Sequence, residues 1–113
     1  MAGIAADLIR GNTDLIILRF LKDHDSYGYE INKKIRELSE GKYELKEATL
    51  YTAFRRLEQD GLIESYWGDE NNGARRRYYR ITDSGKTRYE QGIQEWEDAQ
   101  NLIEKLIRSD DQK

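Results

Sequence analysis

Apolar residues near the start of the chain recur every three or four positions, the spacing of one face of an α-helix. They are Ile4, Leu8, Leu15, Ile16, Leu18, Phe20 and Leu21. This pattern predicts a first helix over residues 5–23. Gly11 lies inside the pattern, and a lone glycine weakens a helix without forbidding it.

A second helix is predicted from Ser26 to Leu38. Ser26 follows the polar pair at residues 24–25, and its hydroxyl suits a helix N-cap. Gly41 is available for the turn after the helix. The predicted buried stripe is Tyr27, Ile31, Ile35 and Leu38.

A third helix is predicted after a short extended stretch at residues 43–45. The segment 47–63 reads EATLYTAFRRLEQDGLI, and Gly61 is a plausible stop. Its apolar positions, spaced by three and four, are Ala48, Leu50, Tyr51, Phe54 and Leu57; its polar side carries Thr49, Thr52, Arg55 and Arg56. One face therefore packs, and the other is free to bind.

The pattern then changes to the alternation of strands. Residues 62–67 alternate as LIESYW, residues 68–74 are rich in Gly, Asn and Asp, and residues 75–82 again suit a strand. This order predicts a β-hairpin.

The last predicted element is a helix of about 25 residues, for which Thr82 and Asp83 offer capping oxygens. Its seam, apolar except for Gln100, is spaced four, three, four, three and four: Tyr89, Ile93, Trp96, Gln100, Ile103 and Ile107. A heptad-like seam calls for a partner helix. We therefore divide the chain into residues 1–82, a dimerisation helix at 83–108 and a disordered tail at 109–113.

Composition narrows the chemistry. The 113 residues include no cysteine and one histidine, which excludes disulfides and thiolate chemistry and argues against a metal site. Asp7 and Arg10 interrupt the N-terminal apolar run, and no stretch approaches the ~18 apolar residues of a membrane span. We expect no membrane segment, no cofactor and a cytoplasmic location.

The net charge of −3 hides a segregation along the chain. Residues 74–90 carry six basic and two acidic side chains, whereas residues 91–113 carry three basic and six acidic ones. A local basic segment on an acidic chain is what a defined nucleic-acid footprint requires.

Three helices followed by a hairpin is the order of a winged helix, in which the third helix enters the DNA major groove and the hairpin, or wing, reaches the backbone or minor groove. The predicted fold class is mainly α with a small β-hairpin: a winged helix-turn-helix DNA-binding domain plus a C-terminal dimerisation helix. Thr and Arg on the third helix suit base edges and phosphates, and the run Arg75-Arg76-Arg77 is followed by two tyrosines.

Residues 47–85, EATLYTAFRRLEQDGLIESYWGDENNGARRRYYRITDSG, resemble the PadR family of bacterial transcription repressors. The resemblance extends from Leu8 to about Leu106. The chain length, the short single C-terminal helix and Trp96 are most similar to the multidrug-binding members that control efflux transporters. The resemblance implies DNA contacts from Tyr29, Lys33, Thr49, Tyr51, Thr52 and Arg55 on the helices and from Gly73, Arg75, Arg76 and Arg77 on the wing.

The same resemblance implies a homodimer joined through the last helix, often with help from the first, on double-stranded operator DNA with an inverted repeat. In the drug-binding relatives a tryptophan pairs with its symmetry mate around a pore that admits planar, often cationic, aromatic inducers. The corresponding pore residues here are Leu8, Asp14, Leu15, Gly92, Ile93, Trp96, Gln100 and Ile103. Gln100 replaces an acidic residue of those relatives, which weakens the case for cationic ligands, although Asp14 can supply a negative charge.

Several alternatives stay open at this stage. Trp96 can simply fill a dimer core, Tyr51 can be a packing residue, and the arginine run can be a solvated charge cluster. A winged-helix dimer that binds proteins instead of DNA is the second hypothesis for function. Catalysis finds no support, because no nucleophile or acid–base pair clusters in the sequence, and RNA binding lacks an aromatic platform. The preferred function is a ligand-responsive repressor of a transporter or stress gene.

Overall fold

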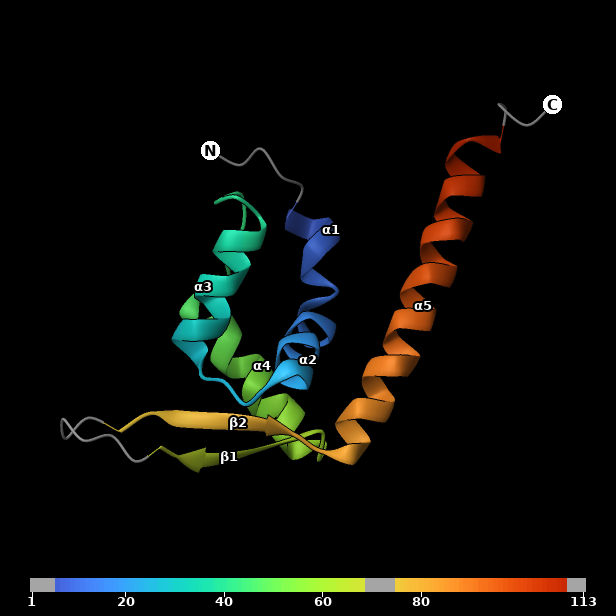
Figure 1. The fold of residues 1–113 in the computed structure, drawn as a ribbon. Coiled ribbons are helices and arrows are strands. Elements are labelled where there is room, and N and C mark those ends of the chain that lie inside the picture. The colour runs from blue at the N-terminus through green and yellow to red at the C-terminus, as the bar shows by residue number, and fades with distance from the viewer. Residues whose placement is uncertain (1–5, 69–74, 110–113) are drawn as a thin grey trace.

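The computed structural model describes residues 6–68 and 75–109 (Figure 1). Along the described chain the elements are α1 (Ala6–Arg10), α2 (Thr13–Asp23), α3 (Gly28–Leu38), α4 (Glu47–Gln59), β1 (Ile63–Trp67), β2 (Arg77–Ile81) and α5 (Asp83–Ile107). The predicted class, mainly α with one β-hairpin, is confirmed. Gly73 and the tail residues 110–113 lie outside the described residues.

The N-terminal region forms two helices, so the prediction of one helix over residues 5–23 is wrong. The chain turns at Gly11 and Asn12 between α1 and α2. The Thr13 hydroxyl donates to the Arg10 carbonyl oxygen at 2.9 Å, and the Asn12 carbonyl oxygen accepts from the Ile16 amide at 2.9 Å. These bonds satisfy the ends of both helices, and glycine followed by asparagine favours a turn.

Ser26 does not cap α3, contrary to the prediction. The backbone of Ser26 pairs with that of Tyr79 in both directions, at 3.1 and 2.7 Å, and this extended bridge joins the helical unit to the hairpin. Tyr27 then occupies the N-cap position without a side-chain hydrogen bond. Leu38, predicted to be buried, is 70% exposed, because the last turn of α3 extends beyond the core.

Helix α4 begins at Glu47 as predicted and ends at Gln59, two residues before Gly61, the predicted stop. Gly61 adopts a φ of 74°, the left-handed conformation that ends helices and suits glycine. The chain can then enter β1, where Ile63 lies opposite Ile81 of β2 and Trp67 opposite Arg77. Ala48, expected on the packed face, is exposed.

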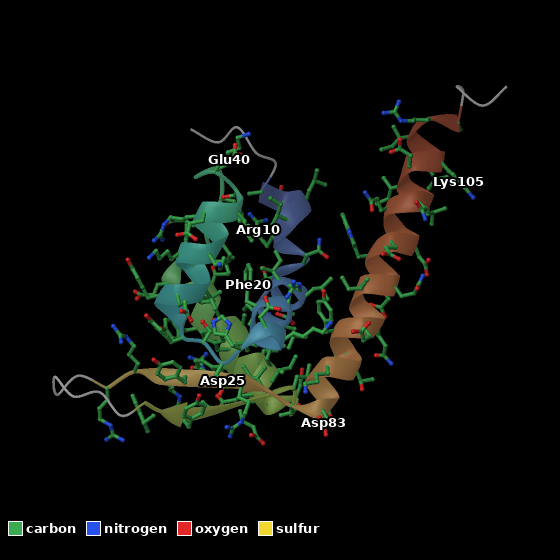
Figure 2. All side chains as sticks on the ribbon, viewed as in Figure 1. Arg10, Phe20, Asp25, Glu40, Asp83 and Lys105 are labelled. Atoms are coloured by element: carbon green, nitrogen blue, oxygen red, sulfur yellow. The ribbon has the colours of Figure 1, made fainter. Side chains whose placement is uncertain are left out.

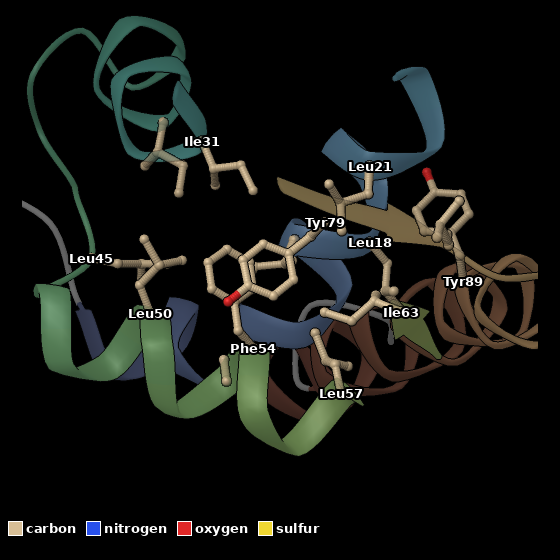
Figure 3. Close-up of a cluster of buried hydrophobic side chains, with 14 residues drawn as sticks. Leu18, Leu21, Ile31, Leu45, Leu50, Phe54, Leu57, Ile63, Tyr79 and Tyr89 are labelled. Carbon is tan, nitrogen blue, oxygen red and sulfur yellow. The ribbon is translucent and has the colours of Figure 1, made fainter. Parts of the chain in front are cut away.

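The core lies between α2, α3, α4 and the base of the hairpin (Figure 3). At its centre the rings of Phe54 and Tyr79 stack at 3.9 Å between centroids. Burial raises the pKa of the Tyr79 hydroxyl. The other buried apolar residues are Ile17, Leu18, Leu21, Ile31, Ile35, Leu45, Leu50, Ala53, Leu57, Ile63, Ile81 and Tyr89. This core fixes α4 and the hairpin in one unit.

Helix α5 follows directly after β2, at the end of the hairpin where β1 begins (Figure 1). The Thr82 hydroxyl accepts from the Gly85 amide at 3.0 Å, which confirms the predicted cap. Tyr89 and Gly92 are buried in the first half of the helix, but every residue from 95 to 109 is exposed. Among the helices of residues 6–68 and 75–109, none is long and apolar enough to span a membrane.

Candidate DNA-binding surface and adjoining groove

The outer face of α4 presents polar side chains. Leu50, Ala53, Phe54 and Leu57 are buried, whereas Thr49, Thr52 and Arg55 are exposed on the opposite side, as predicted. Hydroxyl and guanidinium groups suit base edges and phosphates. The start of this helix is held by Asn32 of α3, whose side-chain amide donates to the Leu45 carbonyl oxygen at 2.7 Å and accepts from the Leu45 amide at 2.9 Å.

The side chain of Tyr51 is partly packed and partly exposed to solvent. Its ring meets the edge of Phe54 at 5.5 Å between centroids, and the side chain is 40% exposed. A Cβ added at Gly28 would lie 2.6 Å from the Tyr51 hydroxyl oxygen, so the ring is seated against the start of α3. Tyr51 thus packs α4 against α3.

Two predicted phosphate neighbours lie on the outside of α3. Tyr29 is 64% exposed and Lys33, one turn later, is exposed on the same face. The Arg36 guanidinium lies 6.0 Å from the centre of the Tyr29 ring. This face therefore carries cations beside an exposed aromatic ring.

The wing carries three arginines beside aromatic rings. The guanidinium groups of Arg75 and Arg77 lie 5.2 and 5.4 Å from the centre of the Trp67 ring. Arg76 lies 4.7 Å from the ring of Tyr27. Aromatic faces attract cations, so these rings hold the arginines near the hairpin while leaving them open to solvent. Sequence reasoning did not single out Trp67, although its alternation with the strand and its place opposite an arginine run were available signals.

A ladder of tyrosines stiffens the hairpin behind the arginines. Tyr66 and Tyr78 stack at 5.7 Å, and Tyr27 meets the edge of Tyr78 at 5.3 Å. The Tyr66 hydroxyl donates to Asp25 at 2.6 Å, and this hydrogen bond raises the pKa of Tyr66. Figure 2 shows Asp25 next to the strands, at the turn between α2 and α3. The wing is therefore anchored to the helices at its side as well as at its base.

Glu58 connects α4 directly to the wing. Its carboxylate accepts from the Ser65 hydroxyl at 2.5 Å and lies 3.8 Å from the Arg77 guanidinium. Arg77 also donates to the Ser65 hydroxyl at 2.8 Å. One carboxylate thus relates the outer face of α4 to the basic strand of the wing.

A groove of about 840 Å³ lies between α5 and the helices α1, α2 and α4. It brings together seven of the eight residues predicted for the ligand pore: Leu8, Asp14, Leu15, Gly92, Trp96, Gln100 and Ile103. Ile93, the eighth, packs against the core instead. At Gly92 helix α5 approaches α2 so closely that an added Cβ would lie 2.6 Å from Leu15 Cδ1.

Asp14 on the groove wall is paired with a cation. Its carboxylate accepts from Arg56 of α4 through both oxygens, with Nε to Oδ2 at 3.2 Å. The hydrogen bond to Asp14 raises the pKa of Arg56. The negative charge expected from Asp14 is therefore neutralised in this structure, and sequence reasoning missed the pair because its members stand 42 positions apart.

The free half of α5 exposes large apolar side chains. Trp96 is 42% exposed, Ile103 52% and Ile107 75%, and Leu102 and Leu106 are also exposed. Figure 2 shows Lys105 on this half, away from the other helices. Large apolar side chains exposed along one helix are typical of an interaction surface.

The helices α2, α3 and α4, with an exposed polar face on α4 and a basic hairpin beside them, have the arrangement of a winged-helix DNA-binding domain. Residues 17–91 match the model of the transcriptional regulator PadR-like family, and the chain belongs to this family. Its members are DNA-binding transcriptional regulators and not enzymes, in agreement with the expectation from the sequence. Within the described residues, no three His, Cys, Asp or Glu side chains gather as metal ligands.

Two solved structures and one further protein are similar to this chain. A transcriptional regulator from Clostridium thermocellum is 52% identical, with a TM-score of 0.81 over 88% of this chain and 96% of that one. A PadR family regulator from Clostridium difficile is 38% identical, with a TM-score of 0.74 over 85% and 98%. An uncharacterised protein of Lysinibacillus sphaericus is 43% identical over 89% of this chain and 93% of its own length.

Proposed function

We propose that this DNA-binding regulator is a sequence-specific repressor that acts as a homodimer on an inverted-repeat operator. The observation that carries the proposal is the wing: Arg75, Arg76 and Arg77 lie beside aromatic rings, and Glu58 ties this wing to the helix that presents Thr49 and Thr52. Base readout by α4 and backbone contact by the wing then occur together. Arg55, Tyr29 and Lys33 add contacts at the edges of this surface, and Tyr51 contributes through its packing. Gly73 belongs to the proposed wing tip.

The exposed half of α5 supports dimerisation. Its apolar seam, Trp96, Ile103 and Ile107, follows the spacing of a two-helix contact. A two-fold pair joined there would hold two copies of α4 about 34 Å apart, the length of one DNA turn. An inverted repeat in the operator follows from this symmetry.

The wing is tested by changing Arg75 and Arg77 to alanine together. Loss of phosphate contacts should weaken binding to the DNA upstream of the protein's own gene and flatten the dependence of log K on log salt, by about 0.9 for each phosphate no longer neutralised. Fluorescence anisotropy with labelled duplex over a salt series measures both. Lys105→Ala, a single basic change on the far half of α5, is the control.

A winged-helix dimer that binds proteins is the alternative function, and the same titration separates the two. Identical binding curves for the wild type and the Arg75/Arg77 double variant at every salt concentration would refute DNA recognition by the wing. The arginine run favours DNA, because the regularly spaced phosphates of a duplex match a run of adjacent cations.

Ligand response is proposed for the groove. Planar aromatic compounds are proposed to enter between α5 and α2 and to stack on Trp96, with Leu8, Asp14, Leu15, Gly92, Gln100 and Ile103 around them, while Ile93 packs against the core. The support is a groove of about 840 Å³ with Trp96 in its wall. Such an inducer would couple the repressor to a transporter or stress gene, as in the multidrug-binding relatives that the sequence resembles.

Tryptophan fluorescence tests the groove, because the chain has two tryptophans in separate places. A planar aromatic probe, 2-naphthol, should quench the wild type and the Trp67→Phe variant but not the Trp96→Phe variant. Quenching that survives in Trp96→Phe and disappears in Trp67→Phe would place the ligand at the wing and overturn the proposal.

A further inference from the structure

Arg56 lies on the same stripe of α4 as the side chains proposed to read DNA. Thr49, Thr52 and Arg56 are separated by three and four positions, which places them one above another on a helix. The backbone therefore presents Arg56 on the side of α4 that carries the hydroxyl groups. Its guanidinium nevertheless bends back to the Asp14 carboxylate of α2.

The Arg56 side chain also lies between two hollows of the surface. On one side it lines the groove together with Asp14, Leu15 and Trp96. On the other side it lines a shallower hollow of about 400 Å³, shared with Thr49 and Thr52. Because Arg56 lines both hollows, its charge has only a short way to move from the groove to the outer face of α4.

The Asp14–Arg56 pair is open to exchange. The side chains of Arg56 and Asp14 are 49% and 43% exposed, so water screens their attraction and the pair is weaker than a buried one, although both oxygens accept from Arg56. A DNA phosphate is a bidentate acceptor of the same kind as a carboxylate. It can therefore replace Asp14 as the partner of Arg56.

We infer that Arg56 binds a DNA phosphate. In the DNA-free protein its guanidinium is paired with Asp14, and it leaves Asp14 when DNA docks on α4. The inference rests on the proposed DNA-binding role of α4. Asp14 then lowers the affinity for DNA, because the ion pair must break each time DNA docks. Because both residues also line the groove, an occupant of the groove that binds either one has a direct route to the DNA face.

The inference predicts that Asp14→Asn binds DNA more tightly than the wild type. The amide keeps the shape of the side chain but no longer competes for the guanidinium. Affinity should rise on the order of tenfold for a dimer, because a weak exposed ion pair is relieved twice. The slope of log K against log salt should steepen by up to about 0.9 for each subunit. In the wild type, the move of Arg56 to a phosphate leaves the Asp14 carboxylate unpaired, and this offsets part of the effect of neutralising the phosphate; asparagine leaves no such charge.

Asp23→Asn is the matched control. Asp23 lies on the same helix and pairs with Arg19 in a similarly exposed contact, so its change removes the same charge without touching α4. Arg56→Gln should bind DNA more weakly than the wild type, and in the Arg56→Gln background the Asp14→Asn change should have only the effect of Asp23→Asn. Circular dichroism and urea unfolding verify that all variants fold.

Two outcomes would overturn the inference: an Asp14→Asn variant no tighter than Asp23→Asn, or a gain from Asp14→Asn that persists without Arg56. The titrations use both the upstream fragment and a random duplex of equal length, because phosphate contacts form on any sequence. Absence of any preference for the upstream fragment in the wild type would count against the repressor proposal alone. A missing difference between the two asparagine variants on both duplexes would count against Arg56 alone.

Discussion

Single side chains set the geometry between helix α4 and the wing. Glu58 accepts from Ser65 and pairs with Arg77, so the orientation of α4 is tied to the basic strand. Trp67 lies against two of the three wing arginines. The sequence makes the arginine run and Trp96 visible, because charge runs and aromatic residues in a seam are local signals. It does not reveal the partners of Glu58, Trp67 or Arg56, because each contact depends on the folded arrangement of separate elements.

The start of α5 depends on the absence of a side chain at Gly85. A Cβ there would lie 2.1 Å from the Leu62 carbonyl oxygen and 2.6 Å from Ile81 Cγ1, and backbone cannot move aside cheaply. We expect Gly85→Ala to lower the free energy of unfolding by about 1–3 kcal/mol, the usual cost of overpacking. Urea unfolding followed by circular dichroism measures it.

Gly11→Ala is the control for this prediction, because an added Cβ at Gly11 meets no atom within 4 Å. Its stability should stay within about 1 kcal/mol of the wild type. Equal midpoints for the two alanine variants would show that the close approach at Gly85 relaxes without cost.

At the scale of elements, the sequence predicts those helices and strands whose ends carry local signals. Gly61 ends α4 and Thr82 caps α5, so the hairpin between them is also recognised. The division of the first helix and the role of Ser26 were not predicted. Gly11 is compatible with a helix by propensity alone, and the pairing of Ser26 with Tyr79 arises only when the hairpin folds back onto the helices.

The position of α4 depends on a link from α3 to the loop before it. Asn32→Ala removes two hydrogen bonds to the backbone of Leu45, a residue only 4% exposed, and leaves its amide and carbonyl without these partners. We expect a loss of about 2 kcal/mol in the free energy of unfolding. DNA affinity should fall further than stability alone explains, because the first turn of α4 loses its tether.

Lys34→Ala controls for this variant, since Lys34 is exposed two positions further along α3. Its unfolding free energy should stay within about 0.5 kcal/mol of the wild type. If Asn32→Ala unfolds at the same urea concentration as Lys34→Ala, the side-chain amide of Asn32 does not hold the loop. Anisotropy with the upstream fragment, at a temperature where both variants are folded, gives the effect on binding.

At the scale of the whole molecule, the chain divides into a closed unit and an open helix. The core lies between α2, α3, α4 and the hairpin. The second half of α5 extends away from this core in the described part of the chain (Figure 1). The sequence indicates this through a seam that continues past Ile93, where the domain can no longer cover it. It does not give the angle at which two such helices cross, because that angle depends on the packing of both copies.

Dimerisation through α5 is tested by placing a charge in the seam. Ile103→Asp should separate the subunits, because a carboxylate buried between two helices loses its hydration without gaining a partner. Sedimentation velocity should then give a monomer. Operator affinity should fall by about 10²- to 10⁴-fold, because the second copy of the DNA-binding surface is no longer attached. Asn101→Asp adds the same charge two positions away, about 200° around the helix, and should remain dimeric. A dimeric Ile103→Asp protein with intact operator binding would mean that the subunits join through another surface, and the exposed seam of α5 would then need a different partner.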